Sequence, residues 1–140
     1  MRENEAMFQE YLQDHGVVFF KASEISQDTT YHGVRNTLVP IKYWDNMVKV
    51  CKLAQEIRQH FGKPVKINSG YRCKAYNKAI SGAAVSQHMF GKALDIRING
   101  VPPAKIAAWM DATYPHKYGR GLYHSFAHID VREGYAKWKG

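Results

Sequence analysis

The most regular alternation of apolar and polar side chains lies between residues 40 and 64. Apolar residues recur there at intervals of three and four, which predicts one long amphipathic helix with a single face toward a core. Pro40 opens the segment, and Gly62 and Pro64 close it, as is typical of helix ends. The same spacing predicts three further helices, in residues 1–16, 74–80 and 102–114.

Alternation with a period of two predicts strands in the second half of the chain. We expect these strands in residues 65–68, 92–98, 119–124 and 126–132, with the last two forming a β-hairpin. Residues 28–40 are polar and contain glycine and proline, so they are predicted to form a loop.

This order of elements, helices first and then strands with inserted helices, predicts an α+β fold with helices packed on an antiparallel sheet. The 140 residues fit a single domain with one core, and no internal repeat is visible. Within the domain 1–140, we expect an N-terminal helix and loop in residues 1–39 and a motif-bearing core in residues 40–132.

The composition narrows the classes of partner. Twenty basic against twelve acidic residues give a net charge of +8, which favours polyanions such as nucleic acid, anionic lipid or a bacterial envelope. The basic residues form no block and no basic-aromatic pattern of a nucleic-acid reader, so nucleic acid is not expected as the partner. No apolar run is long enough to span a bilayer, and two cysteines make no disulfide framework.

Candidate metal ligands fall on one face of two predicted strands. In "FAHIDVR" His128 and Asp130 point away from the apolar side, and in "KALDIRI" Asp95 does the same. If the strands are neighbours, His128 and Asp95 share an exposed face, and the loop at Gly91 lets His88 fold back over it. Two histidines and one carboxylate with an open fourth position are typical of a catalytic zinc site, although another divalent ion fits the spacing too.

These residues also have simpler interpretations. A His-x-Asp pair on a strand is common, His88 fits a surface position, and Asp95 has Lys92 and Arg97 nearby as partners for an ion pair. The spacing alone leaves the choice open.

Two stretches, "SGYRCKAYNKAISGAAVSQHMFGKALDI" and "GRGLYHSFAHIDVR", resemble the zinc D-alanyl-D-alanine peptidases that cut the peptides of bacterial cell walls. That group includes vancomycin-resistance dipeptidases, phage endolysin peptidases and the hedgehog signalling domain fold. Its pattern is Ser-Gly-Tyr-Arg, a nearby Asn, Ser-x-His-x(6)-Asp and a late His-x-Asp. The chain meets every position, with Ser69, Gly70, Tyr71, Arg72, Asn77, Ser86, His88, Asp95, His128 and Asp130.

The resemblance implies that His88, Asp95 and His128 bind Zn2+. It also implies that Arg72 is a catalytic residue that holds the substrate through its planar guanidinium, with a salt bridge at the surface or within the protein as the alternative. Ser86 is expected to bind substrate or orient the site, or else to stabilise the loop through its hydroxyl. Tyr71 is expected to bind substrate or pack beneath the site.

The sequence departs from this group at the general base. Relatives often carry Glu or Asp three residues before the last ligand, or His two residues before it, whereas this chain has Ser125 and Phe126. Two other residues are therefore candidates for the catalytic base. Asp130 shares a face with His128 but could instead orient that ligand, and His124 has an imidazole suited to proton transfer.

We therefore expect a zinc metallopeptidase that hydrolyses peptidoglycan stem peptides, as a D-Ala-D-Ala carboxypeptidase or a cross-link endopeptidase. A phage lysis enzyme is the expected context. It would be monomeric, made in the host cytoplasm without a signal peptide, not inserted in a membrane, and active in the periplasm or cell wall. A virion-associated protein or a non-catalytic zinc-binding scaffold is the alternative.

Overall fold

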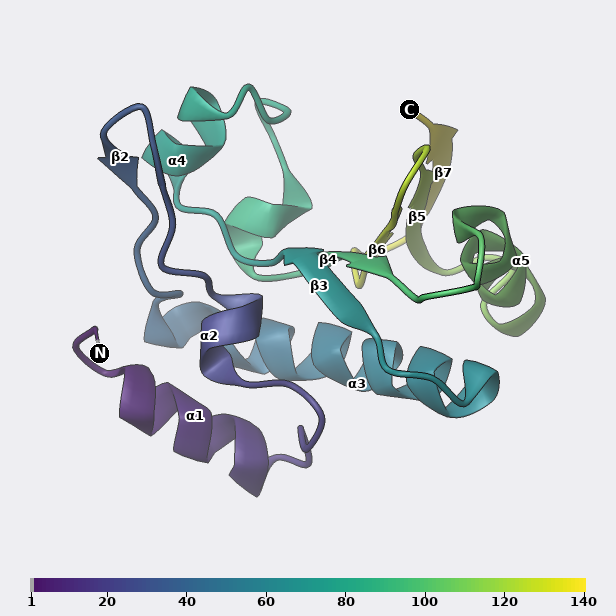
Figure 1. The fold of residues 1–140 in the computed structure, drawn as a ribbon, viewed down its shortest axis with the longest axis horizontal. Helices are drawn as coiled ribbons and strands as arrows, with labels where there is room; N and C mark the ends of the chain where they lie inside the picture. Colours follow the sequence, from purple (N-terminus) through teal and green to yellow (C-terminus); the bar gives the residue numbers. More distant parts are fainter. Residues whose placement is uncertain (1) are drawn as a thin grey trace.

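Helices and strands follow one another in the predicted order in the computed structural model, which describes residues 2–140 (Figure 1). The helices are α1 (Glu5–Asp14), α2 (Ala22–Ile25), α3 (Trp44–Phe61), α4 (Lys74–Ala79) and α5 (Pro103–Thr113), with short turns of 3-10 helix at η1 (Ile41–Tyr43) and η2 (Gln87–Phe90). The strands are β1 (Thr30–Tyr31), β2 (Val34–Arg35), β3 (Lys66–Ser69), β4 (Ala93–Arg97), β5 (Tyr118–Leu122), β6 (Ala127–Asp130) and β7 (Tyr135–Lys139). No helix in residues 2–140 is both long and apolar enough to cross a membrane.

Five strands form the main sheet, in the order β3-β4-β6-β5-β7. Neighbouring strands are antiparallel except β5 and β7, which pair in parallel at one edge. The predicted α+β fold with helices on a mainly antiparallel sheet is therefore confirmed.

Two strand features were missed. The loop prediction for residues 28–40 was wrong in part, because β1 and β2 form a small hairpin there. The edge strand β7 was not predicted, since "YAKWK" contains no β-branched residue and its Tyr and Lys side chains are exposed.

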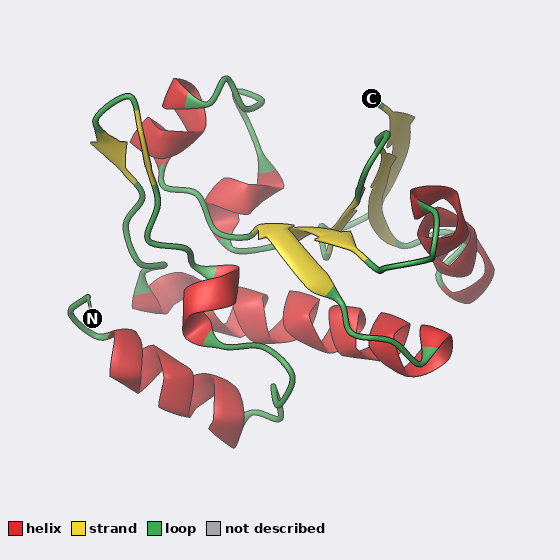
Figure 2. Cartoon of the chain, in the orientation of Figure 1, coloured by secondary structure: helices red, strands yellow, loops and turns green. Residues whose placement is uncertain are grey.

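Helix α3 lies along one face of the sheet, which leaves the opposite face for the candidate ligands (Figures 1 and 2). Its buried Met47, Cys51 and Ile57 belong to the same apolar cluster as Leu94 on β4 and Ile129 on β6. The helix ends as predicted, because Gly62 follows its last residue with a left-handed backbone at φ 65°.

The N-terminal segment packs into this core and supports the chain beneath the site. In α2, the carbonyl oxygen of Ile25 accepts a hydrogen bond of 2.8 Å from the backbone N–H of Tyr71. A Cβ at position 70 would lie 2.0 Å from that oxygen, so only glycine lets the two backbones approach this closely. The contact fixes the peptide group that includes the carbonyl of Gly70, and this carbonyl oxygen forms a hydrogen bond with the imidazole of His88.

The sheet faces follow the predicted period of two. Leu94 and Ile129 are fully buried on the core side, and Asp95 and His128 lie on the other side. The prediction that this second face is exposed was wrong, because Asp95 is only 5% and His128 only 7% accessible. Neighbouring parts of the chain therefore bury most of the ligand face.

Candidate metal centre

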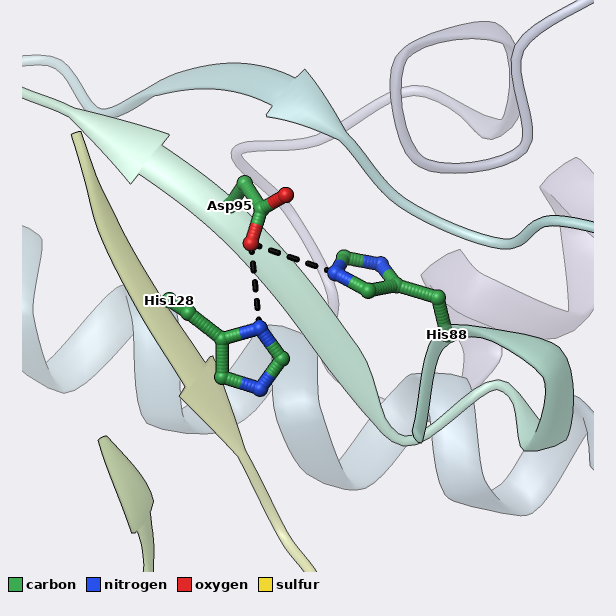
Figure 3. A group of neighbouring side chains, drawn as sticks. All are labelled: His88, Asp95 and His128. Carbon is green, nitrogen blue, oxygen red and sulfur yellow. Dashed lines mark hydrogen bonds and ion pairs between the residues drawn. The ribbon is translucent and has the colours of Figure 1, made fainter. Parts of the chain in front are cut away.

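His88, Asp95 and His128 converge from three separate elements (Figure 3). Asp95 on β4 lies directly opposite His128 on β6 in the antiparallel register, and His88 comes from η2. Oδ1 of Asp95 is 3.1 Å from Nε2 of His88 and 3.1 Å from Nδ1 of His128. One atom from each side chain lies within 4.8 Å of the others, so the structure brings all three predicted ligands together.

The local sequence around η2 explains how His88 reaches the sheet. The hydroxyl oxygen of Ser86 accepts a hydrogen bond from the backbone N–H of His88 at 3.2 Å, which caps the turn. Gly91 then ends the turn with φ 67°, a conformation that other residues rarely adopt. The chain therefore reverses directly into β4, and His88 faces Asp95 seven residues later.

The imidazole of His88 is oriented by a backbone carbonyl. Its Nδ1 lies 2.7 Å from the oxygen of Gly70, and because a carbonyl oxygen only accepts, Nδ1 carries the hydrogen. Burial lowers the pKa of His88, which favours the neutral ring. In that state Nε2 presents a lone pair toward Asp95.

His128 has the opposite arrangement of its two nitrogens. Its Nε2 lies 2.7 Å from Oδ2 of Asp130, so Nε2 donates to that carboxylate and Nδ1 faces Asp95. Burial acts to lower the pKa of His128, but its hydrogen bonds to Asp130 and Asp95 outweigh burial and raise it. A carboxylate behind an imidazole ligand is a common way to fix its orientation and basicity in metal sites.

Asp130 is completely buried, and both of its carboxylate oxygens accept hydrogen bonds. Arg132 donates to it through Nε at 2.8 Å and through Nη2 at 2.6 Å, in addition to the bond from His128. Burial acts to raise the pKa of Asp130, but these hydrogen bonds outweigh it and hold the pKa well below its usual range. This geometry corresponds to the ligand-orienting alternative, and the role of general base stays a prediction.

The glycines of "GRGL" provide the space for this arrangement. A Cβ at Gly119 would lie 2.3 Å from a carboxylate oxygen of Asp130, and a Cβ at Gly121 would lie 2.5 Å from the indole of Trp138. Side chains at both positions would therefore displace groups that surround His128.

The donor set fits a divalent metal ion. One nitrogen of each imidazole and one carboxylate oxygen lie within 4.8 Å of one another, an arrangement that a cation stabilises. Burial acts to raise the pKa of Asp95, but its contacts with His128 and His88 outweigh burial and lower the pKa, so the carboxylate is ionised and available to a cation. Two imidazoles and one carboxylate match the three protein ligands of catalytic zinc sites.

The three ligands form part of the wall of an open cleft of about 390 Å³. Arg72 and Ser86, two of the predicted substrate-binding residues, line the same cleft. Arg72 donates from Nε to Ser69, from Nη1 to Asn77 and from Nη2 to Asp95, at 3.0, 3.4 and 3.1 Å. In this structure its guanidinium therefore orients a candidate ligand.

Two other predicted residues lie outside the cleft. Tyr71 is 7% exposed and lines a neighbouring cleft of about 410 Å³, where burial raises its pKa. His124 is exposed on the turn between β5 and β6 and does not line the cleft with the three ligands. The structure therefore does not bring Tyr71 or His124 to the candidate metal centre, and their roles stay predictions.

Sequence reasoning missed one wall of the cleft, which is formed by Tyr123, Phe126, Arg132 and Trp138. The alternation in "FAHIDVR" placed Phe126 and Arg132 on the ligand face, which was the available signal for these two. Tyr123 lies in a turn, and Trp138 depends on the edge strand β7 that was not predicted.

Residues 18–130 match the sequence profile of one protein family, described as Peptidase M15. No curated protein matches the chain. The matched segment contains all three candidate ligands and covers most of the chain, and it ends before Arg132 and β7. The chain therefore belongs to the Peptidase M15 family of zinc peptidases.

Proposed function

We propose that this protein hydrolyses peptide bonds in bacterial peptidoglycan, as a D,D-carboxypeptidase or a cross-link endopeptidase. One observation carries the proposal: two histidines and one aspartate converge on the wall of an open cleft, with ligand atoms within 4.8 Å of one another. A structural zinc site normally has four protein ligands, whereas three ligands beside a cleft leave a position for water or substrate.

His88, Asp95 and His128 would hold the ion, His88 through Nε2 and His128 through Nδ1. Bound there, zinc polarises a carbonyl and makes water a usable nucleophile near neutral pH. Gly70 and Asp130 fix the two imidazoles from behind, so the donor atoms are in place before the ion arrives.

Arg72 and Ser86 are the proposed substrate contacts on one side of the cleft. Arg72 binds Asp95 and retains N–H groups beyond its three hydrogen bonds, which suits it to a substrate carbonyl or carboxylate next to the ion. Ser86 lines the cleft two residues before the first ligand, although its hydroxyl oxygen also accepts from the backbone of His88.

Proton transfer is the step for which the cleft offers the fewest groups. Asp130 is assigned to orienting His128, because its oxygens already accept from Arg132 and His128. His124 keeps solvent access on the turn before β6, but it does not line the cleft with the three ligands, so its role as the base stays a prediction.

The net charge of +8 suits a polyanionic wall, whose carboxylates and phosphates attract a basic protein. A phage lysis enzyme is the proposed context, made in the host cytoplasm and acting as a monomer on the wall from the periplasm. A virion-associated enzyme is the alternative location.

Turbidity loss of purified Gram-negative sacculi, with mass analysis of the released fragments, tests the proposal. Zinc-loaded wild type is expected to release new peptide termini, and chelator treatment or His88→Ala to abolish release. Their masses identify the bond that is cut. A folded, zinc-loaded protein that releases nothing would contradict the proposal.

One observation favours a second function, that of a zinc-binding scaffold without catalysis. Asp95 is the only carboxylate among the described residues that line the cleft, and it is itself a candidate ligand. Retained zinc binding without hydrolysis of any wall fragment would support this function.

A further inference from the structure

A second wall of the cleft is rich in aromatic side chains, unlike the side that carries Arg72 and Ser86. Tyr123 and Phe126 stack there with ring centroids 4.5 Å apart and an interplanar angle of 8°. Trp138 on β7 and Arg132 complete this aromatic wall, which we define by these four residues. Arg132 and Trp138 follow the segment that matches the family, so the family match assigns nothing to them.

Each part of the aromatic wall is held in place. The indole N–H of Trp138 donates to the hydroxyl of Tyr123 at 3.0 Å, and its ring lies 4.9 Å from that of His128. The parallel register pairs Trp138 with Gly121, whose missing side chain leaves room for the indole. The guanidinium of Arg132 lies 5.1 Å from the same indole and is bound by Asp130 through Nε and Nη2.

The two arginines of the cleft differ in whether one of their guanidinium nitrogens lacks a hydrogen-bond partner. Arg72 donates one hydrogen bond from each of its three nitrogens, to Ser69, Asn77 and Asp95, which leaves it one further N–H group on each Nη nitrogen. Within residues 2–140, Nη1 of Arg132 has no hydrogen-bond partner, and the side chain is 26% exposed. Because Asp130 and the indole already fix the guanidinium, a ligand that binds Nη1 has little side-chain entropy to remove.

We propose that Arg132, framed by Trp138 and Tyr123, is a subsite for a carboxylate of the peptide substrate. The inference rests on the proposed function, since it concerns the substrate of the same cleft. A free guanidinium nitrogen on an aromatic wall suits an acidic peptide residue, whose carboxylate binds the N–H groups while its carbon chain packs on the rings. The carboxylate would lie on the β7 side of the ion, in the same cleft as Arg72.

A carboxylate-to-carboxamide scan tests the subsite. The parent peptide is L-Ala-γ-D-Glu-diaminopimelate-D-Ala-D-Ala, and three analogues each carry one carboxamide, at D-Glu, at diaminopimelate or at the C-terminus. Dissociation constants and kcat/KM are measured for all four peptides with zinc-loaded, full-length protein. For wild type, one carboxamide should weaken binding by about tenfold or more, because a charge-assisted hydrogen bond is lost.

The variant Arg132→Gln separates this role from support of Asp130. Loss of the subsite removes the preference for the carboxylate, so parent and analogue should bind within about threefold of each other. Loss of support alone lowers the affinity for all four peptides by the same factor, and that result would overturn the subsite. So would a wild type that binds the parent and all three carboxamides equally.

A second pair of variants leaves the bond between Arg132 and Asp130 untouched. Trp138→Ala should raise KM for the parent peptide more than it lowers kcat, and Trp138→Phe should restore most of the loss. Lys139→Ala is the matched control, because Lys139 is the next residue of β7 and points to the exposed face. Equal effects of Trp138→Ala and Lys139→Ala would contradict the role of the aromatic wall in binding the substrate.

Measuring binding as well as turnover keeps the two proposals distinguishable. Carboxylate-selective binding without hydrolysis would keep the subsite and overturn the peptidase proposal for this substrate. Hydrolysis without carboxylate selectivity would keep the peptidase proposal and overturn the subsite. A protein that shows neither binding nor hydrolysis would overturn both proposals.

Discussion

Asp95 and His128 face each other directly across the antiparallel pair of β4 and β6, with Oδ1 of Asp95 3.1 Å from Nδ1 of His128. Their proximity is a property of the register, because a shift of one residue would turn one side chain toward the core. The apolar residues on the other face, Leu94 and Ile129, oppose such a shift since they would become exposed. Packing of the core therefore fixes the geometry of the metal centre.

Replacing a ligand should abolish stoichiometric metal binding. Wild type is expected to retain one zinc ion after dialysis, and His88→Ala to retain less than a tenth of that, because two remaining donors rarely form a tight zinc site. The measurement is atomic absorption on dialysed protein. His116→Ala is the matched control, since His116 is exposed and lies outside the ligand cluster. Equal zinc loss from both variants would contradict the assignment.

Asp130→Asn tests the group behind His128. The amide accepts from His128 less strongly than the carboxylate and lacks the charge that pairs with Arg132. We expect zinc affinity to fall roughly 10- to 100-fold, as is usual when such a supporting partner is changed. Competition with a chromophoric chelator at fixed pH measures the affinity. An unchanged affinity would show that Asp130 does not support His128.

The same substitution predicts a pH effect on the metal-free protein. The folded-state pKa of Asp130 is lowered below the unfolded value of about 3.9, so its ionised form stabilises the fold above that pH. This contribution is lost as pH falls through the folded-state pKa. The free energy of unfolding should therefore differ most between wild type and Asp130→Asn near pH 7, and the difference should shrink below about pH 4. Urea unfolding with chelator at several pH values measures it, and a gap independent of pH would contradict the prediction.

Gly119→Ala should damage the centre without touching a ligand. The added Cβ would lie 2.3 Å from a carboxylate oxygen of Asp130, so that carboxylate must move away from His128. We expect zinc affinity to fall and the melting temperature of the metal-free protein to drop. Gly33→Ala is the control, because a Cβ there meets nothing within 4 Å although its φ of 77° strains the backbone. If Gly119→Ala binds zinc like wild type, the space beside Asp130 does not matter.

His124→Ala tests one of the two candidates for the general base. Its imidazole is exposed and does not line the cleft, so we expect kcat/KM on wall peptides to change by less than about tenfold. A fall of about a hundredfold or more would instead identify His124 as the base.

The helices and the ligand-bearing strands were predictable because their periodicities are strong. The stripe that ends at Gly62 and the alternation around His128 each specify one element and one buried face. The ligand set followed from residue type together with the family resemblance, since spacing alone left ion pairs such as Asp95 with Arg97 open.

The second wall of the cleft could not be predicted for a different reason. Trp138 reaches the site only because β7 pairs in parallel with β5, a long-range contact that leaves no local pattern in "YAKWK". The buried environment of Asp130 also depends on tertiary packing. Its partner Arg132 is two residues away, but the space for the carboxylate comes from Gly119 on another strand.

Anomalous diffraction at the zinc edge, from crystals grown with zinc, tests the metal centre most directly. One peak is expected, bound by Nε2 of His88, Nδ1 of His128 and a carboxylate oxygen of Asp95 at about 2.0–2.2 Å, with the fourth position open to the cleft. A zinc ion bound elsewhere, or bound by His88 through Nδ1, would contradict it.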